Sequence, residues 1–226
     1  RDGTLRVTGR LVDASNATLY AVSNLDGQEM VCIYKPIAGE RPLWDFPDGS
    51  LANREYLSFL ISHWLELHLV PPTILRDGPY GTGMVQKWID IDQSVDLMEF
   101  YLTDHPKLRE LALFDLITNN TDRKIGHLIP TQDGHLYGCD HGVTFHEDDK
   151  LRTVLWQWAG TSYTDGEKSL LLKARDLFTG SKLEIINGLI TEEERAATVA
   201  RIDRALIEGS FALPSPDWPA VPWPPF

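Results

Sequence analysis

Apolar and polar residues alternate along the first 35 positions in the manner of β-strands. The strand-like stretches are centred on residues 5–7, 19–21 and 30–35, and two more follow at 73–76 and 83–89. Asp26-Gly27 separates the second stretch from the third and is a typical two-residue hairpin turn, while residues 77–81 form a turn between the last two. The pattern therefore predicts a small antiparallel sheet in the first 90 residues.

The spacing changes to that of a helix between residues 53 and 65. Asn53 is a favourable N-cap, and the apolar positions after it recur every three or four residues: Leu57, Leu60, Ile61, Trp64 and Leu65. Pro71-Pro72 ends the segment, and the Gly, Pro and Asp content of residues 38–52 predicts an irregular loop before it. The segment therefore predicts one helix that buries a single face.

A second helix is predicted at residues 108–119. It is apolar on nearly all sides, so we expect it at the centre of a second lobe. Asp115 interrupts this apolar run and must have a hydrogen-bond partner there. Two short strands are predicted after it, at 127–130 and 135–139.

The last predicted helix runs to about Glu208. Thr191 and Glu194 form a capping box that opens it, and Gly209 ends it. Residues 213–226 are rich in proline and tryptophan, and we expect this tail to be extended and packed on the body of the protein.

The composition narrows the class of protein. With 226 residues, of which 42% are hydrophobic and 24% charged, the chain is typical of a globular protein that buries a large core. Its formal charge of −12 disfavours nucleic acid and anionic membranes as partners. No apolar run approaches the roughly 20 residues that span a bilayer, and the two cysteines, Cys32 and Cys139, form no CxxC pair. We therefore expect a cytoplasmic protein without stable membrane insertion.

Two acidic loops follow the helix at 108–119. The first is Asn119-Asn120-Thr121-Asp122-Arg123-Lys124, and the second is Cys139-Asp140-His141-Gly142. Phosphoryl transfer needs one carboxylate beside the attacking group and another that holds metal on the phosphates. We interpret Asp122 as the group that accepts the proton of the attacking hydroxyl, Lys124 as a cation near the travelling phosphoryl group, and Asp140 as a ligand of Mg²⁺.

Phosphate-binding groups are expected from the first sheet and the helix after it. Lys35 ends an apolar strand, and Glu55 is its natural carboxylate partner if the helix face opposite Leu57 looks into the cleft. Ser15 and Asn16 lie in a hairpin whose donors would cover the phosphates. Each residue taken singly has an ordinary alternative. Lys35 also fits an exposed lysine at a strand end, Glu55 a glutamate that the helix dipole favours, and the hairpin of Ser15 and Asn16 a common turn.

The stretch from residue 83 to 89 is where a two-lobed ATP enzyme would bind the adenine. Backbone groups of a hinge would bond the adenine edge between apolar walls from Met84 and Trp88, with Gln86 and Lys87 between them. A plain turn followed by a strand is the alternative.

A metal site of another kind is the competing hypothesis. His127, His135, Cys139 and His141 lie within fifteen residues and are zinc-compatible donors. Their spacing matches no zinc-finger or HExxH pattern, so structural zinc is disfavoured.

The three kinase-type motifs resemble the catalytic core of the phosphatidylinositol 3/4-kinase superfamily, and above all its type II phosphatidylinositol 4-kinase branch. Lys35-Pro36 resembles the Lys-Pro strand of that family, residues 120–123 its Asn-Thr-Asp-Arg loop, and residues 140–142 its Asp-Asn-Gly loop. The whole chain is also similar to a compact actinobacterial group of phosphatidylinositol-kinase-like proteins of undefined substrate. That similarity lies in the stretches at 14–18, 70–73, 140–143 and 151–156.

The resemblance implies an α+β, two-lobed, protein-kinase-like fold in a single domain. A small antiparallel N-lobe would cover about residues 1–90, with the adenine hinge near 84–89, and a mainly helical C-lobe about 91–212. It also implies ATP as cofactor, with Lys35 on its phosphates, Asp122 as the catalytic aspartate and Asp140 as the metal ligand.

One residue departs from the kinase pattern, which has asparagine five residues after the catalytic aspartate, where this chain has His127. Because Mg²⁺ prefers oxygen donors and imidazole suits Mn²⁺, His127 implies a Mn²⁺ preference, a single Mg²⁺ on Asp140, or impaired catalysis. We expect an ATP-dependent phosphotransferase that acts on a hydroxyl of a protein or small molecule, since the net charge disfavours a lipid. A nucleotide-binding pseudokinase and an AMP-transferring enzyme are the alternatives.

Overall fold

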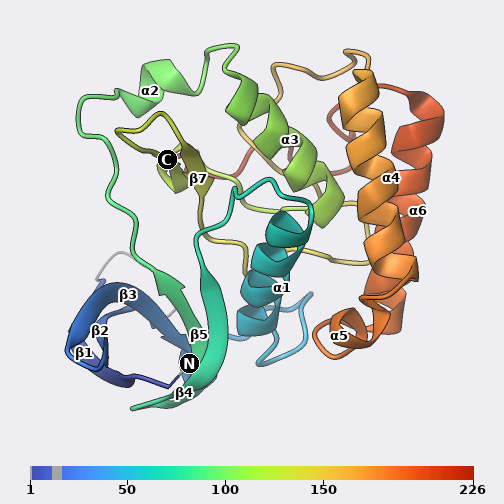
Figure 1. The fold of residues 1–226 in the computed structure, drawn as a ribbon. Helices are drawn as coiled ribbons and strands as arrows, with labels where there is room; N and C mark the ends of the chain where they lie inside the picture. Colours follow the sequence, from blue (N-terminus) through green and yellow to red (C-terminus); the bar gives the residue numbers. More distant parts are fainter. Residues whose placement is uncertain (1, 12–16) are drawn as a thin grey trace.

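Five antiparallel strands form the sheet that the alternating pattern predicts. In the computed structural model, which describes residues 2–11 and 17–226, their order is β1-β2-β3-β5-β4 (Figure 1). The strands are β1 (Thr4–Arg10), β2 (Leu19–Leu25), β3 (Gln28–Pro36), β4 (Thr73–Gly78) and β5 (Gly81–Lys87). Asp26 and Gly27 join β2 to β3 with positive φ angles of 51° and 82°, as a type I′ hairpin turn requires.

The two faces of this sheet bury different groups. One face has a small core of its own: Leu19, Ala21, Cys32, Tyr34 and Val85. The residues between them point to the other face, where Ile33 is paired with Gln86 and Lys35 with Met84. The strand period therefore places Lys35 on the face that looks toward the rest of the molecule.

Helix α1 (Leu51–Trp64) begins earlier than the sequence predicts. Asn53 is not its cap. The backbone N–H groups of Leu51 and Ala52 instead donate to the Glu40 carboxylate, at 3.1 and 2.8 Å. A carboxylate at the positive, N-terminal end of a helix is stabilising. Glu40 lies in the preceding loop and not directly before the helix, so local capping rules do not predict this contact.

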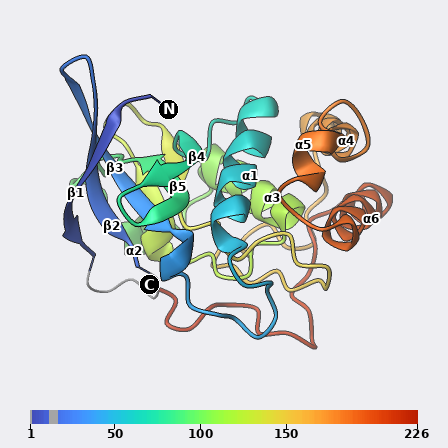
Figure 2. The same ribbon diagram turned by 90° about the horizontal axis from the view of Figure 1, so that it is seen from below.

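The remaining elements build the helical lobe (Figures 1 and 2). They are α2 (Leu97–Phe100), α3 (Pro106–Thr118), the short strands β6 (Leu128–Pro130) and β7 (Leu136–Gly138), α4 (Asp165–Thr179), α5 (Leu183–Asn187) and α6 (Glu192–Glu208). The apolar helix α3 lies within the main core, while α4 and α6 pack side by side on its outer side. Within the described residues, no helix has the length and hydropathy to cross a bilayer.

The ends of the C-lobe helices follow the predicted chemistry. Thr191 and Glu194 form the expected capping box of α6, and Gly209 ends this helix in the left-handed conformation, with a φ of 69°. Helix α3 begins two residues before the predicted start, because Pro106 occupies its first turn and the His105 side chain accepts from the Lys107 N–H.

The proline-rich tail returns to the loops of the C-lobe after α6. The carbonyl of Ala220 accepts from the Thr153 N–H at 3.0 Å and from the Trp156 indole at 2.9 Å. Farther on, the carbonyl of Pro225 accepts from the Ile125 N–H at 2.8 Å. The end of the tail therefore lies beside Ile125, just before β6, and Figure 1 shows the C-terminus in this part of the molecule.

A buried ion pair joins α1 to α6. The Arg54 guanidinium binds the Glu194 carboxylate and donates to the carbonyl of Thr144 at 2.6 Å. Both side chains are almost fully buried. Removal of one partner from such a pair leaves a charge that water cannot solvate.

We predict that Arg54→Met lowers the free energy of unfolding by about 3–5 kcal/mol. The matched control is Arg175→Met, which breaks the Arg175–Asp203 pair between α4 and α6. Both of those side chains are 40% exposed, so the loss should be far smaller than in Arg54→Met. Urea denaturation at one pH measures both values, and equal losses would contradict this account of the contact between α1 and α6.

Candidate active site

The amine of Lys35 joins two carboxylates from distant parts of the chain. Its Nζ lies 2.6 Å from Glu55 Oε1 and 2.9 Å from Asp140 Oδ1. Strand β3 carries Lys35, α1 carries Glu55, and Asp140 lies in the loop after β7. Glu55 is buried, whereas the side chain of Asp140 is 49% exposed and can meet a ligand from solution.

Glu55 also holds the loop that carries Asp140. Its Oε2 accepts from the backbone N–H of His141 at 3.0 Å. The helix therefore uses two faces: Leu57 and Ile61 pack in the main core, and Glu55 looks at Lys35. This is the condition under which the sequence predicted a Lys35–Glu55 pair.

Asp122 lies near Asp140 but is held by other cations. Its carboxylate is 3.7 Å from Lys124 Nζ and 3.4 Å from Arg152 Nη2. Arg152 also donates to the Thr121 carbonyl at 2.7 Å, so it fixes the same loop. Arg152 was not singled out from the sequence as a site residue, although it lies in one of the stretches that carry the resemblance.

The buried Arg123 ties the two acidic loops together. It forms an ion pair with Asp115 of α3 at 2.9 Å, donates to the carbonyl of Cys139 at 2.7 Å, and lies 2.7 Å from His141 Nε2. Asp115 also accepts from the Asn120 side chain at 3.1 Å. Asp115 thus has the partners that its place in an apolar helix requires. Through Arg123 it fixes the distance between the loops of Asp122 and Asp140.

The electrostatics give the two aspartates different properties. Lys35 is the main reason that the pKa of Asp140 lies well below its usual value, so this carboxylate stays ionised. Burial raises the pKa of Asp122, and the negative Asp140 raises it further, while Lys124 and Arg152 oppose this. A raised pKa makes Asp122 the better proton acceptor of the two.

Asp140 has an unusual backbone for a residue with a side chain. Its φ is 59°, in the left-handed region that aspartate and asparagine tolerate better than most residues. Such conformations collect at functional sites, because surrounding contacts must enforce them. Here the bond from His141 to Glu55 and the pair with Lys35 do so.

A cavity of about 310 Å³ opens beside Lys35 and Asp140. Its polar wall contains Gln86, Lys87 and His127, and Trp88 stands next to them. Its apolar wall is made by Leu11, Ile33, Pro71, Ile89, Ile91, Leu128 and Ile129. The volume and the mixture of an apolar wall with a few charged groups are typical of a small-molecule site.

The structure brings together some predicted site residues and leaves others aside. Six of them line this cavity: Lys35, Gln86, Lys87, Trp88, His127 and Asp140. Glu55 is bound to Lys35, and Asp122, paired with Lys124, lies near enough to Asp140 for the two charges to interact, but neither Asp122 nor Lys124 lines the cavity. Met84 is fully buried and does not line the cavity. Ser15 and Asn16 lie outside the described residues.

The zinc-compatible side chains have other partners. His135 Nε2 donates to the carbonyl of His68 at 2.8 Å, and His141 binds Arg123. Burial raises the pKa of the Cys139 thiol to about 12, which disfavours the thiolate that zinc needs. Over residues 2–11 and 17–226, no three histidine, cysteine or acidic side chains are grouped to hold a metal ion.

His127 is a neutral group beside Asp140. Burial is the main cause that lowers its pKa to about 4; Arg123, Lys124 and Lys35 lower it as well, and Asp140 opposes them. Lys124 N–H donates to its Nδ1 at 3.3 Å, so the neutral ring carries its proton on Nε2, 3.6 Å from Asp140 Oδ2.

This shift predicts a pH dependence of stability. Between the unfolded pKa near 6.5 and the folded value of about 4, the unfolded chain binds more protons at His127, so stability falls as the pH drops through this window. The loss is on the order of 3 kcal/mol between the two limits. Urea denaturation of wild type and of His127→Asn at pH 7 and pH 4.5 measures it. We expect a clearly smaller loss in the variant, and parallel losses would contradict the buried neutral imidazole.

The chain is similar to one known protein in sequence and to another in fold. No family model matches the chain. Protein Rv2133c of Mycobacterium tuberculosis (strain ATCC 25618 / H37Rv) is 38% identical over 260 aligned residues, which cover 100% of this chain and 93% of that protein. The crystal structure of the Helicobacter pylori proinflammatory kinase CtkA superposes with a TM-score of 0.52.

The structural match covers 93% of this chain and 94% of CtkA, at 11% sequence identity. At that identity the likeness shows the fold alone, and the fold is kinase-like: a small antiparallel N-lobe on a helical C-lobe. The chain therefore belongs to the family of Mycobacterium tuberculosis Rv2133c and has the α+β, kinase-like fold that its sequence predicts.

Proposed function

We propose that this protein transfers the γ-phosphate of ATP to a hydroxyl group. The observation that carries the proposal is the bridge from Lys35 to both Glu55 and Asp140 at the wall of a cavity, with Asp122 beside it. Kinases use such a lysine on the nucleotide phosphates, a glutamate that orients it, and an aspartate on the metal. The kinase-like fold and the resemblance of the three motifs to the phosphatidylinositol 3/4-kinase superfamily support these roles.

In this proposal the cavity receives ATP. Its adenine would lie between Trp88 and the apolar wall, against the backbone after β5, and its phosphates would extend toward Lys35. The amine keeps its charge there, because Asp140 and Glu55 together outweigh the effect of burial and raise the pKa of Lys35. Asp122 would accept the proton of the attacking hydroxyl, with Lys124 near the transferred group.

A divalent metal fits Asp140 better than it fits His127. Asp140 is ionised and half-exposed, and hard cations prefer such oxygen donors. His127 already accepts from Lys124 with Nδ1, so its Nε2 carries a proton and has no free electron pair for a metal. Asp140 and the phosphates would therefore hold one metal ion, which supplies positive charge to the transferred group. His127 would orient Asp140.

The acceptor in this proposal is a hydroxyl of a protein or small molecule. The formal charge of −12 repels anionic lipid surfaces, and the sequence contains no basic cluster to offset it. A binding-only pseudokinase is the second candidate, because His127 occupies the place of a metal-binding asparagine. The presence of Lys35, Asp122 and Asp140 together favours an active phosphotransferase over a pseudokinase.

We predict that the purified protein incubated with ATP labelled at the γ-phosphate, Mg²⁺ or Mn²⁺ and a cell extract labels an acceptor. Loss of the proton acceptor in Asp122→Asn should lower the rate by about 10²–10⁴-fold. Asp140→Asn should lower it at least as much, and asparagine keeps the left-handed backbone. Asp133→Asn, at an exposed loop, is the matched control and should retain full activity.

The outcomes separate the candidate functions. Transfer of the α-label in place of the γ-label would identify an AMP-transferring enzyme. ATP-dependent thermal stabilisation without any transfer would identify a pseudokinase. Full activity of Asp122→Asn or Asp140→Asn would remove the assigned roles, even if the protein proved to be a kinase.

The assignment of one metal site makes a separate prediction. We expect Mg²⁺ and Mn²⁺ to support transfer within about threefold of each other, since only oxygen donors contact the ion. His127→Asn should leave this ratio unchanged. A Mn²⁺ preference above about tenfold that disappears in His127→Asn would instead identify Nε2 as a metal ligand.

A further inference from the structure

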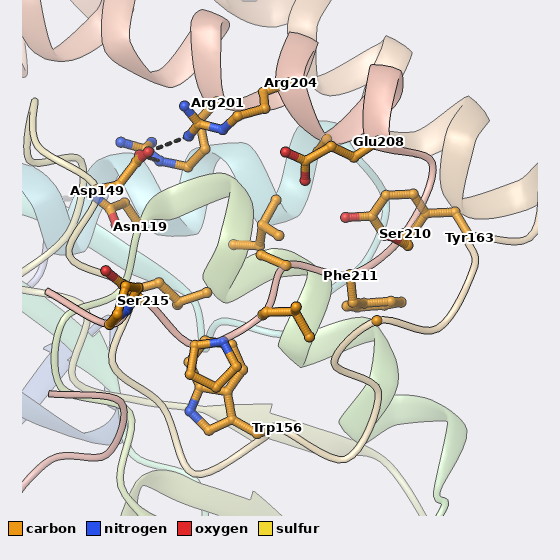
Figure 3. A pocket seen from close by; sticks show the side chains of 18 residues that line it. Asn119, Asp149, Trp156, Tyr163, Arg201, Arg204, Glu208, Ser210, Phe211 and Ser215 are labelled. Carbon is orange, nitrogen blue, oxygen red and sulfur yellow. Dashed lines mark hydrogen bonds and ion pairs between the residues drawn. The ribbon is translucent and has the colours of Figure 1, made fainter. Parts of the chain in front are cut away.

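Two of the cavities in this molecule differ in what their polar groups indicate. The larger one, of about 750 Å³, lies beside the last turns of α6 (Figure 3). Among the described residues, two acidic and two basic side chains line it, and Asp149 is bound to both Arg201 and Arg204. These charges balance, so they indicate no class of ligand. The smaller cavity at Lys35 is more informative, because the side-chain amide of Gln86 lies in its wall.

A chain of hydrogen bonds fixes the orientation of the Gln86 amide. The Thr73 hydroxyl donates its one hydrogen to the carbonyl of Pro71 at 2.7 Å. Toward Gln86 this hydroxyl can therefore only accept, and it accepts from Nε2 at 2.9 Å. Thr73 is fully buried, so bulk water does not compete for its hydroxyl. The amide nitrogen is thus turned to Thr73, which leaves the amide oxygen for another partner.

The amide oxygen of Gln86 is free to accept from a ligand in the cavity. Among the described residues, Oε1 has no hydrogen-bond partner, and it is not one of the polar atoms that are sealed in the interior. Gln86 lines the cavity together with Ile33 and Lys35, which share its face of the sheet. Only 6% of the residue is exposed, so the cavity is the side from which this oxygen can be reached.

The position of Gln86 in the sheet assigns this oxygen to the base of a nucleotide. In the proposed binding mode the phosphates extend toward Lys35, and the base lies against the backbone after β5. Gln86 is the second-last residue of β5 and pairs with Ile33, which is two residues, or about 7 Å, from Lys35 along β3. An amide oxygen also repels phosphate oxygens, because both are acceptors. A group of the base, and not a phosphate, therefore faces Oε1.

We propose that Gln86 selects nucleotides whose base carries an amino group at carbon 6. Adenine presents a 6-amino donor to Oε1, whereas guanine and hypoxanthine present a 6-carbonyl acceptor. Because Thr73 holds the amide, that carbonyl would face Oε1 and both acceptors would stay unpaired. Thr73 is a positioning residue here, since without it the amide would be free to turn and offer Nε2 to a carbonyl. The inference rests on the proposed phosphotransferase and makes ATP, and not GTP, its phosphate donor.

Binding of nucleoside diphosphates tests this selectivity without turnover. Isothermal titration calorimetry of the full chain with Mg²⁺ compares ADP, inosine diphosphate and purine riboside diphosphate. Their bases carry an amino group, a carbonyl and a hydrogen at carbon 6. We expect ADP to bind at least about tenfold more tightly than inosine diphosphate, because two acceptors would otherwise face each other. Purine riboside diphosphate should bind about fivefold more weakly than ADP, since it lacks only the donor.

Two variants locate the selectivity. Gln86→Met keeps the length of the side chain without its amide, and should lower the preference for ADP over inosine diphosphate at least about fivefold. Thr73→Val keeps the shape of the side chain without its hydroxyl, and should lower the same preference at least about threefold, because the amide then turns. Gln28→Met, at the exposed start of β3, is the matched control and should leave the preference unchanged. If Gln86→Met does not fold, the wild-type ratios of the three diphosphates still decide.

The outcomes separate this inference from the proposed function. Equal binding of ADP and inosine diphosphate, or a preference for ADP that Gln86→Met leaves unchanged, would overturn the inference and leave the phosphotransferase standing. A Thr73→Val variant that weakens the binding of all three diphosphates alike would remove the positioning role of Thr73. If neither these diphosphates nor ATP binds the wild type, the inference and the nucleotide site fall together.

Discussion

The bridge from Lys35 to two carboxylates, at the junction of the two lobes, is the interaction on which the rest of this site depends. The Lys35 side chain lies on the face of the sheet opposite to the sheet's small core. There it binds Glu55 from α1 and Asp140 from the loop after β7. A charged amine at that depth is stable only because two carboxylates outweigh the cost of burial. The pairing therefore fixes the helix and the loop relative to the sheet as well as supplying a cation.

The helical lobe supports this arrangement with a second buried pair. Asp115 and Arg123 are both fully buried, and Arg123 extends from there to the carbonyl of Cys139 and the ring of His141. The loop of Asp122 and the loop of Asp140 are thus attached to one guanidinium. Because a buried charge without its partner is strongly destabilising, neither loop can move alone at low cost. This rigidity keeps two aspartates of unlike pKa close together.

Local patterns in the sequence predict the parts of this fold that obey local rules. The alternating pattern predicted the strand that ends at Lys35, the Asp26-Gly27 turn predicted the first hairpin, and the capping box predicted the start of α6. Contacts between distant residues escaped prediction. Glu40 caps α1 from a loop eleven residues away, and Arg152 reaches Asp122 from thirty residues further along the chain. Met84 shares the face of Lys35 yet is buried away from the cavity, which strand alternation alone cannot distinguish.

The central claim is that Lys35 and Asp140 converge on one triphosphate. Isothermal titration calorimetry with a non-hydrolysable ATP analogue and Mg²⁺ tests it directly, because binding is measured apart from turnover. The account predicts one nucleotide per chain and an affinity at least about tenfold lower in Lys35→Met, since a charge-assisted bond to phosphate is lost. A wild-type protein that binds no nucleotide, or a Lys35→Met variant that binds it equally well, would contradict the account.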